Sequence, residues 1–370
     1  MNTLLSILAF IVLLAVLVGF HEWGHLAVAR SNGVFCEIFS IGMGKKLVEW
    51  KDKHGTKWRI SLFPIGGYVK MFGDADATSV REQIPEGYTE EDMQRMSAFR
   101  KKPWQRILIA LGGPVANFVM AIVLLFCLGC IKGIPEPSSE ITVVSEDTLA
   151  YKSGLRTKDT IIKFNDSDIK SFADLAPKLR EAKGTDYTLT VMRNGVSKTL
   201  NIKMYTELDG EKKPIDKLGI RSQGYSYKKT TVSSAFSNAC SKTWDITKSS
   251  VSGIAKLFQK RENIENVGGI ISIFKMSAQG AGSGMSEFIL ILAILSAMLG
   301  AMNLLPIPCL DGGTVLINAI EWIYRRSLSE KVIEIIFSIG LVLVVGLMLL
   351  GLWNDVTHLS VFSKIASIFK

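Results

Sequence analysis

The feature that most constrains this chain is a long apolar run that leads directly into a metal-binding motif. Residues 3–20 are almost entirely apolar, and the sequence HEWGH follows them without a break. A run of about 20 apolar residues can cross the hydrocarbon core of a bilayer. We therefore predict a membrane helix over residues 3–30, with His21 and His25 on one helix face and Glu22 beside them.

An HExxH motif on a helix is typical of zinc metalloproteases, in which the histidines bind the metal and the glutamate is the general base. The alternative interpretation is a surface helix that carries two histidines at helical spacing by chance. Ionisable side chains at the end of a membrane helix are costly, however, and usually mark a functional site. The chain has four histidines, and two of them fall in this motif. We therefore expect His21 and His25 to bind Zn²⁺.

The composition indicates a membrane core with one soluble insertion. The 370 residues are 48% hydrophobic and 21% charged, too apolar for an ordinary soluble protein and too polar for membrane helices alone. The predicted fold class is an α-helical polytopic membrane protein with about four membrane helices, a cytoplasmic β-hairpin and one inserted α+β domain. The net charge of +9 suits cytoplasmic loops beside a lipid bilayer, so we expect no nucleic-acid partner.

The alternation of apolar and polar segments divides the chain into four parts. The two outer parts carry the membrane helices, predicted at 3–30, about 104–131, about 285–305 and about 332–352. Between them lie a small α+β domain and then a linker with an amphipathic helical region. The predicted boundaries of the four parts are 1–131, 139–205, 206–283 and 284–370.

The segment that follows the motif predicts a β-hairpin. Trp58, Ile60 and Leu62 alternate with polar residues, as in a strand with one buried face, and His54-Gly55 is typical of a turn. His54 is therefore expected in a turn and not at a metal site. Residues 72–96 are polar and poor in apolar side chains, which favours a flexible loop.

Residues 139–205 have the pattern of a soluble domain. The predicted order is strand, short helix, strand, amphipathic helix and a hairpin whose turn is Arg193-Asn194-Gly195. This order indicates a small α+β domain or a small barrel. Beyond it, apolar residues between Val232 and Phe258 recur at roughly helical spacing, which predicts an amphipathic helix.

Basic residues indicate which loops are cytoplasmic. They are concentrated between residues 30 and 106, with a cluster at 100–102 next to the second predicted membrane helix, and again at 325–331. By the positive-inside rule these segments lie in the cytoplasm. Four spans then put the N-terminus, the 139–205 domain and the C-terminal tail outside, and the metal motif toward the cytoplasmic side.

A catalytic zinc typically has three protein ligands and one open position, so a third ligand is needed beside His21 and His25. Asp311 is the candidate, because it is an acid in an apolar setting, within the sequence NLLPIPCLDGG. The predicted topology brings all three side chains to the cytoplasmic ends of their helices. The alternative interpretation of Asp311 is a helix cap. Glu22 is expected to take a proton from water and later give it to the leaving amine.

Peptide hydrolysis also requires an extended substrate, because a helix hides its carbonyls in backbone hydrogen bonds. The hairpin around Trp58, Ile60 and Leu62 offers a strand edge on which a substrate could pair. Asn303, an amide in an apolar helix, could hydrogen-bond a freed backbone group. Two alternatives stay open: the hairpin only anchors at the membrane surface through Trp50 and Trp58, and Asn303 only packs between helices.

The second predicted membrane helix contains a small-residue stretch, made up of Gly112, Gly113, Pro114 and Asn117. Glycine pairs and proline in membrane helices allow close packing or a local break. A packing kink and a direct role in the metal site are both open for this stretch.

Three motifs, HEWGH, GGPVAN and NLLPIPCLDGG, together resemble the site-2 protease family of intramembrane zinc metalloproteases, and most closely its bacterial regulator-of-sigma-E protease branch. Residues 139–205 resemble the PDZ domains of that branch. The resemblance implies roles for five residues: Zn²⁺ ligands His21, His25 and Asp311, catalytic base Glu22 and substrate contact Asn303.

The resemblance also implies a multi-pass protein of the bacterial cytoplasmic membrane. Its substrates would be single-span membrane proteins, often anti-sigma factors already trimmed outside, or remnant signal peptides. The best-known members carry two PDZ domains, whereas this chain has room for one.

One alternative is an inactive membrane scaffold that recruits partners through its PDZ domain, but the intact HExxH and Asp311 argue against it. A zinc transporter would need several charged membrane positions along a path, and the sequence shows one cluster.

Overall fold

The computed structural model describes residues 3–74, 84, 87–144, 148–181, 186–203, 205–208, 211–214, 220–221, 225–257 and 268–358. The chain forms two compact units. Unit 1 consists of Met1–Leu128 and Phe236–Lys370, and unit 2 of Gly129–Ala235. The candidate functional residues lie within unit 1.

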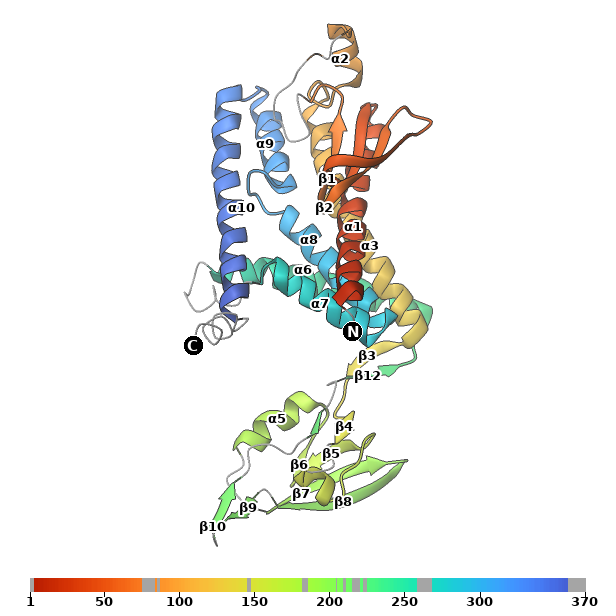
Figure 1. The fold of residues 1–370 in the computed structure, drawn as a ribbon, viewed down its shortest axis with the longest axis vertical. Coiled ribbons are helices and arrows are strands. Elements are labelled where there is room, and N and C mark those ends of the chain that lie inside the picture. The colour runs from red at the N-terminus through yellow and green to blue at the C-terminus, as the bar shows by residue number, and fades with distance from the viewer. Residues whose placement is uncertain are drawn as a thin grey trace. The chain divides into compact units, whose positions relative to one another are not determined.

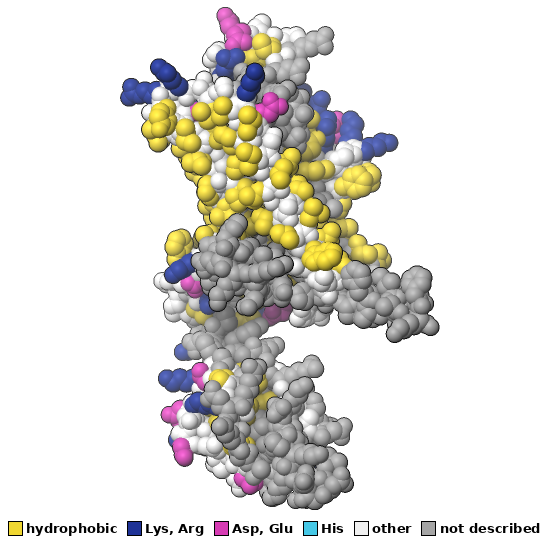
Figure 2. Space-filling model, turned by 90° about the vertical axis from the view of Figure 1, so that its left-hand side faces the viewer, with side chains coloured by type: hydrophobic (Ala, Val, Ile, Leu, Met, Phe, Trp, Pro, Cys, Tyr) yellow, Lys and Arg dark blue, Asp and Glu magenta, His cyan; other side chains and the backbone are white. Residues whose placement is uncertain are grey.

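Among the described residues, unit 1 has four helices that are long and apolar enough to cross a membrane (Figure 1). They are α1 (Thr3–Ser31), α3 (Pro103–Lys132), α8 (Met285–Asn303) and α10 (Glu330–His358). Each matches a predicted membrane helix, so the prediction of a polytopic helical protein is confirmed. Figure 2 shows apolar side chains covering the face of unit 1 that carries α10, with Lys and Arg gathered at one end. Such a surface suits a bilayer better than water.

Two facing glycines let α1 and α3 cross at close range. A Cβ at Gly24 would lie 2.2 Å from the carbonyl oxygen of Gly112, and a Cβ at Gly112 would lie 2.6 Å from that of Gly24. The two backbones therefore touch, as in other small-residue contacts between membrane helices. Pro114 also lies inside α3, two residues after Gly112.

The N-terminal half of α1 packs into an apolar core shared with α3 and α8. Its buried members are Leu13, Leu17, Met120, Leu292 and Leu295. Two further helices belong to the predicted 206–283 region: α6 (Val232–Leu257), and α7 (Ile270–Ser283), which lies against α1, α8 and α10. Helix α6 confirms the amphipathic helix predicted from Val232, whereas Phe258 lies outside the described residues.

The predicted hairpin is a sheet of two long strands, β1 (Cys36–Lys51) and β2 (Lys57–Met71). Both strands fold back on themselves, so that Phe39 pairs with Trp58 on one side and with Val69 on the other. Trp58 pairs in turn with Trp50. The order across the sheet is therefore 67–71, 36–41, 57–61 and 46–51.

This pairing corrects the predicted position of the strand edge. Trp58 and Ile60 lie in an internal segment that pairs with β1 on both sides, so an added strand cannot bind there. Bends at Gly42, Gly44 and Gly66, with φ of 88°, 87° and 85°, turn the strands back. Side-chain alternation identifies a strand, but it does not show how often a glycine-containing strand bends.

Asp52 connects the turn of the hairpin to the end of α1. Its carboxylate accepts hydrogen bonds from the backbone N–H of His54 at 2.9 Å and of Thr56 at 3.0 Å, and from Trp58 Nε1 at 2.9 Å. Arg30, in the last turn of α1, forms an ion pair with the same carboxylate. The prediction that His54 is a turn residue is therefore confirmed.

Part of the predicted loop 72–96 is a helix, α2 (Glu90–Met96). Thr89 and Asp92 form a capping box at its start, and Met93 is completely buried. The loop prediction was wrong here because so short a helix is signalled by its cap and by one buried side chain, and not by an apolar face. Most of the predicted loop before residue 87 lies outside the described residues.

Unit 2 is a small α+β domain (Figure 1). Its main sheet is antiparallel, in the order β6 (Ser167–Asp168), β5 (Thr160–Phe164), β7 (Asp186–Arg193) and β8 (Val196–Lys203). The helices are α4 (Leu149–Lys152) and α5 (Phe172–Glu181). Three shorter pairs are β3 (Ile134–Pro137) with β12 (Tyr225–Lys228), β4 (Val143–Val144) with β11 (Ile220–Arg221), and β9 (Tyr205–Leu208) with β10 (Glu211–Pro214).

The order of elements in unit 2 follows the sequence prediction. Strand β4, helix α4, strand β5, helix α5 and the β7–β8 hairpin succeed one another as expected. Asn194 and Gly195 both have positive φ, 50° and 79°, as a two-residue type I′ hairpin turn requires. Leu155, Leu175 and Leu189 are completely buried, so the domain has an apolar core of its own.

Candidate metal centre

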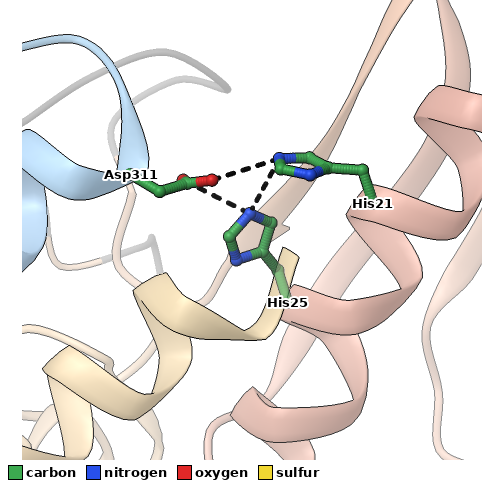
Figure 3. Close-up of side chains that lie close together, drawn as sticks. All are labelled: His21, His25 and Asp311. Carbon is green, nitrogen blue, oxygen red and sulfur yellow. Dashed lines mark hydrogen bonds and ion pairs between the residues drawn. The ribbon is translucent and has the colours of Figure 1, made fainter. Parts of the chain in front are cut away.

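Three side chains that can bind a metal converge where α1 meets α9 (Asp311–Tyr324) (Figure 3). His21 and His25 project from successive turns of α1, and Asp311 is the first residue of α9. The two imidazole Nε2 atoms lie 3.3 Å apart. They lie 3.2 Å and 3.3 Å from the two carboxylate oxygens of Asp311. Within the described ranges, this is the one cluster of three such residues that could hold a metal ion.

The spacing and the chemistry of these groups fit zinc. Zinc bonds to imidazole nitrogen and carboxylate oxygen are about 2.0–2.2 Å long, so the donors of a tetrahedral site lie roughly 3.3–3.6 Å apart. The observed separations of 3.2–3.3 Å are close to that range. Asp311 Oδ2 is buried, and apart from His21 Nε2 at 3.2 Å it has no polar partner among the described residues, as expected of an oxygen that binds a cation. Two imidazoles and one carboxylate are a common donor set of catalytic zinc.

Glycines hold Asp311 in position. A Cβ at Gly312 would lie 2.3 Å from the carbonyl oxygen of Leu305, and a Cβ at Gly340 of α10 would lie 2.2 Å from that of Pro308. The segment between α8 and α9 is therefore packed against its neighbours backbone to backbone, which side chains at these two positions would prevent.

Both imidazoles have a partner on α3 for their second nitrogen. His25 Nδ1 lies 2.8 Å from the carbonyl oxygen of Ile109, and His21 Nδ1 lies 3.1 Å from the side-chain amide of Asn117. Histidines that bind metals usually have such a partner, which sets the ring orientation and the tautomer. Helix α3 thus holds both candidate histidine ligands in position without contributing one of the three candidate ligands.

Gly113 leaves the space that the two imidazoles occupy. A Cβ at this position would lie 2.3 Å from His25 Nε2 and 2.6 Å from His21 Cε1. The residues of the GGPVAN stretch therefore differ in what they contact. Gly112 serves helix packing, whereas Gly113 and Asn117 contact the candidate ligands.

A cavity of about 330 Å³ opens beside the three side chains, and it is lined by Glu22, Asn303 and the β2 segment 67–69. The Glu22 carboxylate interacts with the backbone N–H of Val69. Asn303 Nδ2 lies 3.4 Å from His21 Nε2. Both residues therefore reach the space in which a substrate bond would lie next to the candidate metal ligands.

A second cavity, of about 670 Å³, shares Glu22, His25 and Asp311 with the first and extends along α9. At its far side Arg106 Nη2 donates a hydrogen bond to Glu321 Oε2 at 2.7 Å. This part-buried pair was not predicted from the sequence, because no local pattern connects the start of α3 with α9. The cavity has both polar and apolar lining and leads away from the candidate metal ligands.

The structure brings together five of the predicted site residues, namely His21, Glu22, His25, Asn303 and Asp311. The predicted contacts Trp58, Ile60 and Leu62 line neither cavity. The β2 residues that do so are Gly67, Tyr68, Val69 and Met71. The sequence contains one signal for this segment, the Gly66-Gly67 pair, since glycine in a strand often marks a close approach of backbones.

Residues 9–347 of the chain match the family model of peptidase family M50. The metalloprotease MmpA of Caulobacter vibrioides is 32% identical, and the alignment covers 99% of each chain. The regulator of sigma-W protease RasP of Bacillus subtilis is 28% identical, over 96% of this chain and 99% of that protein. The zinc metalloprotease RasP of Bacillus licheniformis is also 28% identical, over 97% of this chain and 100% of that protein.

Proposed function

The chain belongs to peptidase family M50, the site-2 protease family, and we propose that it cuts single-span membrane proteins within or near their membrane segment. The predicted enzyme class, a zinc metalloprotease with a Zn²⁺ cofactor, is confirmed by the family and the relatives. Four membrane-capable helices make it a multi-pass bacterial membrane protein. The observation that carries the proposal is that His21 and His25 lie on one of these helices, α1.

In the proposed site His21, His25 and Asp311 hold the zinc ion. Once bound there, zinc supplies the Lewis acidity that activates a water molecule and polarises the scissile carbonyl. Glu22 takes the proton of that water and delivers it to the leaving amine nitrogen. Its place in the cavity supports this role, because it lines the same space as the ligands without joining their cluster.

We propose that the substrate is held extended by adding a strand to the free edge of β2 at residues 67–71. This edge replaces the internal segment around Trp58 as the candidate. Its support is that segment 67–69 lines the first cavity, together with Glu22 and the candidate metal ligands. Asn303, which also lines this cavity, offers its amide to a substrate backbone group.

For unit 2 we propose a PDZ-like domain that selects substrates and performs no chemistry. The order of its strands and helices supports this assignment, and its described residues contain no cluster of metal ligands. We place unit 2 on the extracytoplasmic side and the metal site toward the cytoplasm, since basic residues concentrate in the loops beside the metal site. The Bacillus subtilis relative is named for sigma-W regulation, which supports anti-sigma factors as the substrate class, with remnant signal peptides as a second class.

The proposal is tested with the full chain in lipid vesicles and a single-span anti-sigma factor trimmed to a short external end. We expect a cut within or near the membrane segment, located by mass spectrometry, that a chelator abolishes and added zinc restores. Cleavage that resists the chelator, or that occurs only in a soluble part of the substrate, contradicts it.

The role of unit 2 is tested with a folded variant lacking residues 139–205. This variant should still cut the short, trimmed substrate and should also begin to cut substrates with large external domains. Failure to cut the trimmed substrate would show that the domain does more than select.

A further inference from the structure

The two candidate histidine ligands differ in what holds their second nitrogen. His25 Nδ1 lies 2.8 Å from the backbone carbonyl oxygen of Ile109. A carbonyl oxygen only accepts hydrogen bonds, so Nδ1 carries the ring proton and Nε2 keeps a lone pair for a metal ion. The backbone thus fixes the tautomer of His25.

His21 has a partner that can act in two ways. Its Nδ1 lies 3.1 Å from Nδ2 of Asn117, and an amide NH₂ group only donates. In this orientation Nδ1 accepts, and the proton of the neutral ring is on Nε2, which lies 3.2 Å from Asp311 Oδ2. An Nε2 atom that carries a proton cannot bind a metal ion. Half a turn of the amide exchanges its NH₂ group for its oxygen, which has nearly the same shape.

The surroundings of Asn117 allow this half turn. The side chain is completely buried, and its Oδ1 atom has no hydrogen-bond partner among the described residues. Turning the amide therefore breaks only the hydrogen bond to His21 and replaces it with one from His21 Nδ1–H to Oδ1. The backbone stays in place, because the carbonyl oxygen of Asn117 accepts a hydrogen bond from Ser296 Oγ of α8 at 2.8 Å.

We propose that Asn117 is a positioning residue that selects the metal-binding tautomer of His21. With Oδ1 toward the ring, it accepts the Nδ1 proton and leaves the Nε2 lone pair directed at Asp311 and the metal. With Nδ2 toward the ring, Asn117 donates to Nδ1 and favours the other tautomer, in which Nε2 carries the proton and cannot bind a metal ion. The inference rests on the proposed role of His21 as a zinc ligand, and it adds a specific determinant of zinc affinity on α3.

The test compares two substitutions that separate hydrogen-bond chemistry from shape. Asn117→Leu keeps the approximate size and removes the acceptor, whereas Asn117→Asp has oxygens that accept the Nδ1 proton in either orientation. Asn318→Leu is the matched control, because Asn318 is also buried in a helix, and its hydrogen bond goes to the Thr314 carbonyl oxygen, at 2.8 Å, and not to a histidine. The zinc dissociation constant is measured on each purified full-length protein by competition with a chelator, with the unfolding midpoint of the metal-free protein as the second readout.

We expect Asn117→Leu to raise the zinc dissociation constant by about 10–100-fold, as for other partners of metal-binding histidines. Asn117→Asp should keep the wild-type value or lower it, and Asn318→Leu should keep it. A merely structural role of Asn117 would lower the unfolding midpoint of the metal-free protein in both Asn117 variants. Wild-type zinc affinity in Asn117→Leu would overturn the proposal. Weakened zinc affinity in Asn117→Asp would also overturn it, and this second test can be made even if Asn117→Leu does not fold.

His21→Ala in the same assay separates this inference from the proposed site. Wild-type zinc binding by His21→Ala would show that the ligand set is wrong, and the role of Asn117 would fall with it. Loss of zinc in His21→Ala together with full binding in Asn117→Leu would keep the ligand set and reject only the role of Asn117.

Discussion

Gly113 lies so close to His25 that a Cβ at position 113 would be 2.3 Å from the imidazole Nε2 atom. Moving the helices apart to make room would break the backbone contact of α1 with α3 at Gly24 and Gly112. The lack of a side chain at position 113 is therefore a requirement of the site and not only of helix packing.

Gly113→Ala should consequently lose most bound zinc and the cleavage activity while the helices stay folded. The added methyl group displaces both imidazoles from their convergence with Asp311. Metal analysis and circular dichroism of the purified protein measure the two effects. The control is Gly346→Ala in α10, where a Cβ would meet nothing within 4 Å. Full zinc content in Gly113→Ala would show that the imidazoles do not need this space.

Glu22→Gln should keep its zinc and lose its cleavage activity. Glu22 lines the cavity beside the ligands but is not one of them, and an amide cannot accept and return a proton. General acid–base catalysis contributes about 10²–10⁴-fold, so turnover should fall by about that factor. His25→Ala, which removes a ligand, should lose both zinc and activity. Normal turnover by Glu22→Gln would rule out the proposed mechanism.

Asp311→Asn should lose most of its zinc as well as its activity. The substitution keeps the shape of the side chain but removes the negative charge, which lies 3.2–3.3 Å from the two imidazole Nε2 atoms. Zinc content and cleavage are measured on the same preparation. If the variant retains full zinc occupancy, the third ligand lies elsewhere in the chain.

The sequence was informative wherever the constraint is local. Helical spacing is enough to bring His21 and His25 to one face, and apolar length is enough to predict the four membrane helices. Predicting Asp311 as the third ligand required one further step. The positive-inside rule puts the helix end that carries His21 and His25 and the helix end next to Asp311 on the same side of the membrane. These are the residues that the structure brings together.

The features that the sequence did not predict depend on how segments distant in the chain cross, and no local pattern encodes such crossings. The contact of Asn117 with His21 follows from the crossing of α1 and α3 at Gly24 and Gly112. The two-sided pairing of Trp58 follows from bends at glycines within β1 and β2, so alternation alone did not show which strand is the free edge.

Asp52 gives the hairpin a dependence on pH. Burial disfavours its charge, but hydrogen bonds from Trp58, Arg30 and the backbone N–H of Thr56 outweigh this cost and hold the pKa of Asp52 below its ordinary range. A carboxyl whose pKa is lower in the folded state stabilises the fold above its unfolded pKa, about 4, and loses this effect as the pH falls through the folded pKa.

Asp52→Asn should therefore lower the unfolding temperature at neutral pH, and its difference from the wild type should shrink below about pH 4. Thermal unfolding across this range measures it. Asp168→Asn is the control, since Asp168 is exposed and its ion pair with Lys163 is long, at 3.7 Å. A difference that is as large in acid as at neutral pH would show that the charge of Asp52 is not what stabilises the turn.

The free edge of β2 gives the sharpest test of how a substrate is held. Val69 pairs with Phe39 on its inner side, and the Val69 N–H belongs to the edge segment 67–69 that lines the first cavity. Proline at position 69 removes this N–H from the edge, whereas alanine keeps it. If the substrate pairs here, Val69→Pro should lower kcat/KM by roughly 2–12-fold relative to Val69→Ala, the equivalent of one backbone hydrogen bond, with zinc content unchanged.

The kinetic constants then separate three explanations. Loss of substrate pairing appears mainly in KM, whereas disturbance of Glu22 appears mainly in kcat. If the hairpin only anchors the protein at the membrane surface, Trp50→Ala and Trp58→Ala should reduce activity and proline at position 69 should match alanine. Because Trp58 is paired on both sides, its loss should act through the fold of the sheet and lower the unfolding temperature, which Val69→Ala should not do. Equal kinetics of Val69→Pro and Val69→Ala in folded, zinc-loaded protein would show that the substrate does not add to this edge.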